Sequence, residues 1–146
     1  MRVAASVPAD RFDWAPAPGA FSFADVLRHL AAIERWMYGE TAAGRPSRYP
    51  GHGRELADGP EAVRGYVVRM HEDAMAIFAG LPDERWQGPA VTPAGAAITT
   101  RKWLRAMVEH EAHHRGQLYL MLRLCGIETP PIYGLTSEDV RRKSAG

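Results

Sequence analysis

The sequence predicts an all-α fold, a bundle of helices joined by irregular loops. Three long segments place apolar residues three or four positions apart, the spacing that lines one face of a helix. The stretches between them, residues 45–59 and 82–98, are rich in glycine and proline and show no strand-like alternation over more than a few residues. With 146 residues, 46% of them apolar, the chain has the length and composition of one globular domain.

The first long helix is predicted from Ser22 to about Ala43. Ser22 and Asp25 have the spacing of a capping box, with aspartate in place of the usual glutamate. Gly44 and then Pro46 end the helix, because glycine suits the position after a helix and proline cannot continue one. The apolar positions that recur along this segment are Phe23, Val26, Leu30, Ile33 and Met37.

Two further long helices are predicted beyond it. One opens at Pro60, which suits a first helical position, and ends before Pro82. Its apolar stripe is formed by Val63, Val67, Met70, Ala74, Ile77 and Leu81. The other begins near Thr99 or Thr100 and runs to Gly126. Its stripe includes Trp103, Leu104, Met107, Leu118, Met121 and Leu122.

The two ends of the chain are predicted to be irregular. Residues 128–135 read as an extended strap, and a short charged helix is expected from about Ser137 to Lys143. We therefore expect a single helical domain over residues 1–146. Residues 1–20 form a stub and connector in it, and residues 136–146 form a frayed tail.

A weak internal repeat relates the two halves of the chain. Residues 7–12, Val-Pro-Ala-Asp-Arg-Phe, resemble residues 81–86, Leu-Pro-Asp-Glu-Arg-Trp. A predicted helix over residues 60–81 precedes the second copy, whereas only residues 1–6 precede the first. If the halves are equivalent, the first helix is shortened or missing. A second copy of the chain, in a homodimer, would then cover the exposed core.

Charge and cysteine content exclude several classes of function. Eighteen basic residues against seventeen acidic ones give a formal net charge of +1, which supplies no broad field for nucleic acid or an anionic membrane. A single cysteine, Cys125, excludes an internal disulfide framework and suits a reducing compartment. No apolar run approaches the ~20 residues of a membrane span, and residues 1–8 do not resemble a signal peptide. The prediction is a cytoplasmic protein with no nucleic-acid or membrane partner.

Two histidines have the spacing of half a metal site. His110 and His114 lie one turn apart on the third long helix and continue its apolar stripe. A buried neutral imidazole needs a partner for each of its two nitrogens, and a metal ion together with an outer acceptor satisfies both. The alternative is a pair of core histidines held by ordinary hydrogen bonds.

His29 is the natural third ligand, since it lies about 40° from Ile33 on the flank of the buried stripe of its helix. The alternative is a half-buried histidine at a helix interface. His71 follows Met70, on the apolar stripe of another helix, and is a possible substitute ligand. His113 lies off the apolar stripe of its helix and is less suited to bind a metal ion. His52 reads as a loop residue.

The segments around these histidines resemble a known family. Residues 107–118, MVEHEAHHRGQL, look like the last core helix of the DinB/YfiT-like family, and residues 130–135 resemble the segment after that helix in the family. Residues 27–36, LRHLAAIERW, resemble the helix that carries the first metal histidine of that family. The resemblance implies a DinB/YfiT-like four-helix bundle. It also implies a divalent metal ion, zinc or nickel, held by His29, His110 and His114.

A site of three neutral ligands leaves the metal ion its full charge and an open position, so that it can lower the pKa of a bound water or thiol. Members of the family that this chain resembles include thiol-dependent transferases. The resemblance therefore implies an enzyme that activates a thiol or water for transfer to, or hydrolysis of, a small electrophilic substrate. No residue is assigned as catalytic, and His113 and Glu111 are weak candidates for a base. The alternatives are a non-catalytic metal- or ligand-binding stress-response protein and a purely structural dimer.

Overall fold

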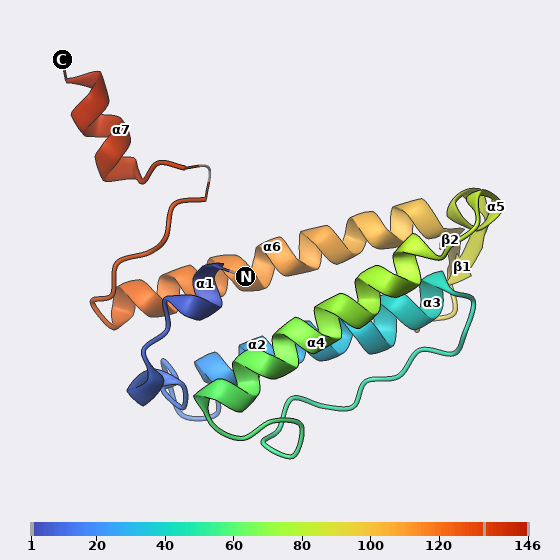
Figure 1. Ribbon diagram of the computed structural model, residues 1–146, viewed down its shortest axis with the longest axis horizontal. Helices are drawn as coiled ribbons and strands as arrows, with labels where there is room; N and C mark the ends of the chain where they lie inside the picture. The colour runs from blue at the N-terminus through green and yellow to red at the C-terminus, as the bar shows by residue number, and fades with distance from the viewer. Residues whose placement is uncertain (1, 133, 146) are drawn as a thin grey trace.

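Three long helical segments run alongside one another in the computed structural model, which describes residues 2–132 and 134–145 (Figure 1). Met1, Tyr133 and Gly146 lie outside the described residues. In chain order the elements are α1 (Arg2–Ala5), the 3₁₀ turn η1 (Ala9–Arg11), α2 (Phe23–Ile33), the π-helical segment η2 (Glu34–Gly39), α3 (Glu40–Ala42), α4 (Pro60–Ala79), α5 (Asp83–Gln87), β1 (Pro89–Val91), β2 (Ala97–Thr99), α6 (Thr100–Leu124) and α7 (Ser137–Ser144). The prediction of an all-α fold is confirmed.

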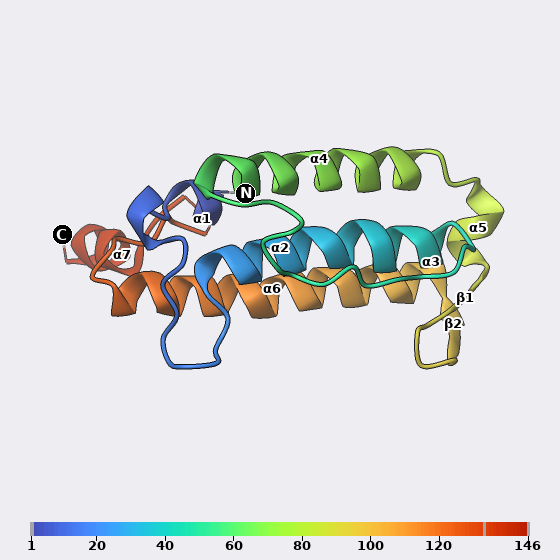
Figure 2. The same ribbon diagram turned by 90° about the horizontal axis from the view of Figure 1, so that it is seen from below.

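The segment α2–η2–α3 is the central helix of the arrangement. Figure 2 shows it between α4 and α6, and α2 contacts both of them. The residues that α2 buries include Phe23, Val26, Leu27 and Leu30, which are at most 5% exposed. Packing on two sides is what makes this helix apolar around most of its circumference. No helix among the described residues is long and apolar enough to cross a bilayer.

The predicted ends of the central helix are confirmed. Ser22 Oγ accepts a hydrogen bond from the Asp25 backbone N–H at 3.1 Å, and Asp25 Oδ2 accepts one from the Ser22 N–H at 3.0 Å. Gly44 follows the helix with a φ of +76°, a conformation that favours glycine. The π-helical turn within the helix was not predicted, because it does not change the apolar spacing enough to be read from the sequence.

The other predicted helices are confirmed within one or two residues. α4 begins at Pro60 and α6 at Thr100, where the side chain of Thr99 accepts a hydrogen bond from the Lys102 N–H at 3.2 Å. The charged helix α7 is capped by Thr136 and Asp139, and it lies beyond the C-terminal end of α6 (Figure 1).

The expectation of loops without strands is wrong in one place. β1 and β2 form a small antiparallel hairpin in which Ala90 pairs with Ile98. Each strand has only three residues, which is too short for an alternating pattern to appear. The Thr100 N–H donates to the carbonyl of Gly88, the residue before the hairpin, at 3.0 Å, and this bond fixes the start of α6.

The internal repeat corresponds to two similar local structures. Pro8 precedes the 3₁₀ turn η1 and Pro82 precedes α5, and both prolines have extended backbone angles. The expected shortened first helix is α1, four residues long, whose Val3 and Ala4 are buried. α1 contacts α6, whereas the corresponding helix α4 contacts α2 along a much longer face.

Arg28 ties the loop between α3 and α4 to the central helix. Its side chain is 2% exposed, and its Nε and Nη1 donate to the carbonyls of His52 and Ala57 at 2.7 and 2.9 Å. Its Nη2 donates to Asp25 Oδ1 at 2.7 Å. One buried guanidinium thus holds two points of a loop that contains no regular structure.

Replacing Arg28 with methionine keeps the aliphatic stem but removes these donors, which leaves two carbonyls and a carboxylate without their partner. We expect Arg28→Met to lower the free energy of unfolding by about 3 kcal/mol in urea titrations. The exposed Arg54, which pairs with Asp13 on the surface, provides the control, and Arg54→Met should lower it by less than about 1 kcal/mol. Equal losses in the two variants would contradict the assigned role of Arg28.

Candidate metal centre

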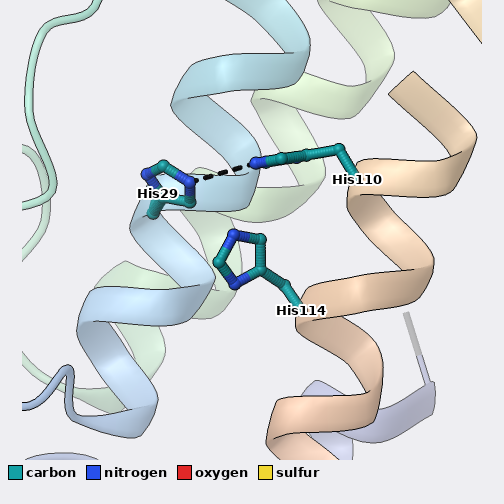
Figure 3. Close-up of side chains that lie close together, drawn as sticks. All are labelled: His29, His110 and His114. Atoms are coloured by element: carbon teal, nitrogen blue, oxygen red, sulfur yellow. Dashed lines mark hydrogen bonds between the residues drawn. The ribbon is translucent and has the colours of Figure 1, made fainter. Parts of the chain in front are cut away.

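His29, His110 and His114 come together between α2 and α6 (Figure 3). One ring nitrogen from each lies within 4.8 Å of the other two. His29 Nε2 and His110 Nε2 are 3.3 Å apart, and the ring centroids of the three pairs are 4.6 to 5.2 Å apart. The structure therefore brings together all three residues that the sequence singled out as ligands.

The helices explain why the rings meet. His110 and His114 are separated by one turn of α6, so both project from the same face of that helix. α2 packs against this face and presents His29 to it. All three side chains are half-buried, so they lie inside the helix contact but remain open on one side.

Outer hydrogen bonds occupy the Nδ1 atoms of two of the three rings. His29 Nδ1 is 2.8 Å from the Tyr49 hydroxyl, which is in turn 2.7 Å from His52 Nδ1. His114 Nδ1 is 2.9 Å from Gln117 Oε1. These bonds orient the rings with Nε2 toward the centre, the arrangement typical of metal-binding histidines.

The sequence did not predict these outer hydrogen bonds. His52 was expected to be an ordinary loop residue, but the structure places its ring in contact with Tyr49 and Phe21. Tyr49 carried no signal, because a single tyrosine in an irregular loop has no periodic neighbours. Gln117 could have been found, since it lies three residues after His114 on the same helix face.

The remaining histidines lie outside the cluster. His113 is exposed, as its place off the apolar stripe predicts, and its ring contacts only the edge of the cluster at His114. His71 is bonded instead to Glu34, with 2.8 Å between Nδ1 and Oε1. Burial raises the pKa of Glu34, although the hydrogen bond from His71 opposes the rise.

Burial and mutual repulsion keep His29 and His110 neutral. The pKa of His29 is lowered to about 4, first because burial disfavours the charged ring and then because of the neighbouring imidazoles. The pKa of His110 is lowered to about 4 for the same reasons. At neutral pH both rings keep a free lone pair, which is the form that binds a metal ion.

One pair of the three donors already has the spacing that a tetrahedral divalent ion requires. Two nitrogens bound to one zinc ion at about 2.0–2.1 Å lie about 3.3 Å apart in tetrahedral geometry. The His29–His110 separation already has this value, at 3.3 Å. Three imidazoles suit zinc, nickel and other borderline metals, so the donor set can hold a metal ion without specifying which.

Comparisons with known proteins show the family and the fold of the chain. The sequence profile of the DinB superfamily matches residues 1–118. A DinB-like protein from Bacillus subtilis has a similar structure, with a TM-score of 0.70 and 18% identity over 90% of this chain and 88% of its own. Another from Bacillus cereus has a TM-score of 0.72 and 14% identity over 90% and 87%. No curated protein matches the sequence.

The metal-free protein should lose stability as the pH falls from about 6.5 to about 4. His29 and His110 have folded pKa values of about 4 against 6.5 in the unfolded chain, so the unfolded chain binds protons first in this interval. The contribution of the two neutral rings to the free energy of unfolding is fully present above pH 6.5 and is lost as the pH falls toward 4.

Urea midpoints measured across this range test the expectation. A His29→Gln, His110→Gln double variant should show a shallower fall than the unaltered chain, whereas Val108→Gln, which changes an exposed side chain on the same helix, should not. An unchanged slope in the double variant would show that His29 and His110 are not held neutral.

Proposed function

The chain belongs to the DinB superfamily, and from this premise we propose that it is a metal-dependent enzyme acting on a small electrophilic substrate. His29, His110 and His114 would bind one divalent ion, zinc or nickel. The observation that carries the proposal is the convergence of three ring nitrogens within 4.8 Å of one another. Three protein ligands are the usual number in a catalytic site that keeps a position open for substrate.

A bound ion would supply a Lewis acid that lowers the pKa of a water or of a low-molecular-weight thiol. The residues of this chain hold the site in shape. Tyr49 and His52 fix the ring of His29, and Gln117 fixes that of His114. Because these contacts come from a loop and from α6 itself, they set the direction of the Nε2 lone pairs before any ligand arrives.

The proposal also covers the cellular setting and assembly. A reducing, cytoplasmic compartment suits a chain with one free thiol. We also propose a homodimer, since α6 leaves Val108, Leu120 and Leu124 exposed. Association would remove this apolar surface from water.

Turnover assays test the catalytic part of the proposal. Zinc- or nickel-loaded protein should transfer one of a panel of low-molecular-weight thiols to a chromogenic electrophile, or hydrolyse a chromogenic ester. His110→Ala should abolish the rate, whereas His113→Ala, which removes an exposed ring outside the cluster, should retain it within about twofold. Full metal occupancy with no turnover of either kind would favour the non-catalytic binding protein instead.

Removing the Tyr49 hydroxyl should weaken metal binding without abolishing it. Tyr49→Phe leaves the ring in place but frees His29 to rotate, and we expect a loss of about 10- to 100-fold in affinity, measured by competition with a chromophoric chelator. Tyr119→Phe is the matched control, because the Tyr119 hydroxyl bonds to the Pro130 carbonyl rather than to any histidine of the cluster. Equal affinities in the two variants would remove Tyr49 from the site.

Light scattering over a concentration series tests the homodimer. We expect a molar mass twice that of the chain at micromolar concentration. The mass of a single chain at every concentration would contradict it.

A further inference from the structure

A cavity of about 270 Å³ lies between the central helix, α4 and α6. Most of its wall is apolar, with Leu30 and Ile33 on one side and Val67 and Met107 on two others. His110 also lines it, so a molecule in the cavity would lie beside the candidate metal centre. The volume is near the lower end of the range for small-molecule sites, and a mainly apolar lining with a few polar groups is typical of them.

Three of the six polar side chains that line the cavity are acidic. Glu34, Glu72 and Glu111 line it, and no lysine or arginine does so among the described residues. The carboxylate of Glu34 is 22% exposed and has the imidazole of His71 as its partner. Glu111 has only a loose contact to Arg115, with 3.9 Å between Oε1 and Nη1.

These two properties together select a ligand. An apolar wall favours a hydrocarbon or aromatic body, because filling the cavity removes that body from water. A carboxylate held in such surroundings gains more from a cation than one in bulk water does, since the lower effective dielectric strengthens the attraction. Anions are disfavoured by the same three carboxylates.

We infer that the cavity binds a small molecule with an apolar body and a protonated amine, the amine held by Glu34 and the body placed against Met107 beside His110. That this ligand also carries the electrophilic group of the substrate rests on the proposed function, whereas the binding itself does not. The amine would bind Oε2 of Glu34, because the hydrogen bond of His71 is to Oε1.

Three probes with the same body test the inference: 2-phenylethylamine, 2-phenylethanol and 3-phenylpropanoate. Binding is measured by calorimetry and by NMR shifts near neutral pH, with both metal-free and zinc-loaded protein. We expect saturable binding of the amine, at least about tenfold tighter than that of the alcohol, and no binding of the carboxylate.

Two variants locate the interaction. Glu34→Gln keeps a hydrogen-bond acceptor for His71 but removes the charge, and it should weaken amine binding by about tenfold. Glu61→Gln removes an exposed carboxylate in the first turn of α4, away from the cavity. It should change the affinity for the amine by less than about twofold. Unfolding curves of both variants confirm that the fold is intact.

Equal binding of the amine and the alcohol, or an unchanged affinity in Glu34→Gln, would overturn the inference. So would the absence of amine binding to both forms of the protein. Amine binding to a protein that takes up no zinc would support the inference and contradict the proposed function, so the two failures are distinguishable.

Discussion

The candidate site depends on three imidazole rings that face one another, in surroundings that disfavour a charge on His29 and on His110. In the neutral state each ring has one N–H and one lone pair, and the Nδ1 atoms of His29 and His114 are already engaged by Tyr49 and Gln117. The Nε2 atoms face the centre of the cluster, where they can bind only one another or a shared ligand. A hydrogen bond can satisfy two of them, whereas a metal ion satisfies all three at once.

The neighbour of His29 in the sequence makes that arrangement possible. Arg28 is buried on the adjacent face of α2 and holds the carbonyls of the loop that carries Tyr49 and His52. One turn of one helix therefore both supplies a candidate ligand and anchors the segment that orients it. The site is built from long-range contacts, and the helix α6 alone would give only two of its three rings.

The sequence predicted those parts of the fold that are local in the chain. Helix ends were predictable because Ser22, Asp25 and Gly44 each act on backbone within a few residues of themselves, and the pairing of His110 with His114 follows from the pitch of a helix. The hairpin at Ala90, the π-helical turn and the placement of Tyr49 could not be predicted in this way. Each depends on contacts to which no periodic pattern in the sequence corresponds.

Metal content measured on gently purified protein tests the central claim most directly. Elemental analysis of the unaltered chain should give about one zinc or nickel per chain, and none in His29→Ala, His110→Ala or His114→Ala variants that remain folded by circular dichroism. His113→Ala should keep its metal, since that ring is exposed and outside the cluster. A folded chain that contains no metal and takes up neither added Zn²⁺ nor Ni²⁺ would contradict the account, and the three histidines would then be core residues joined by hydrogen bonds alone.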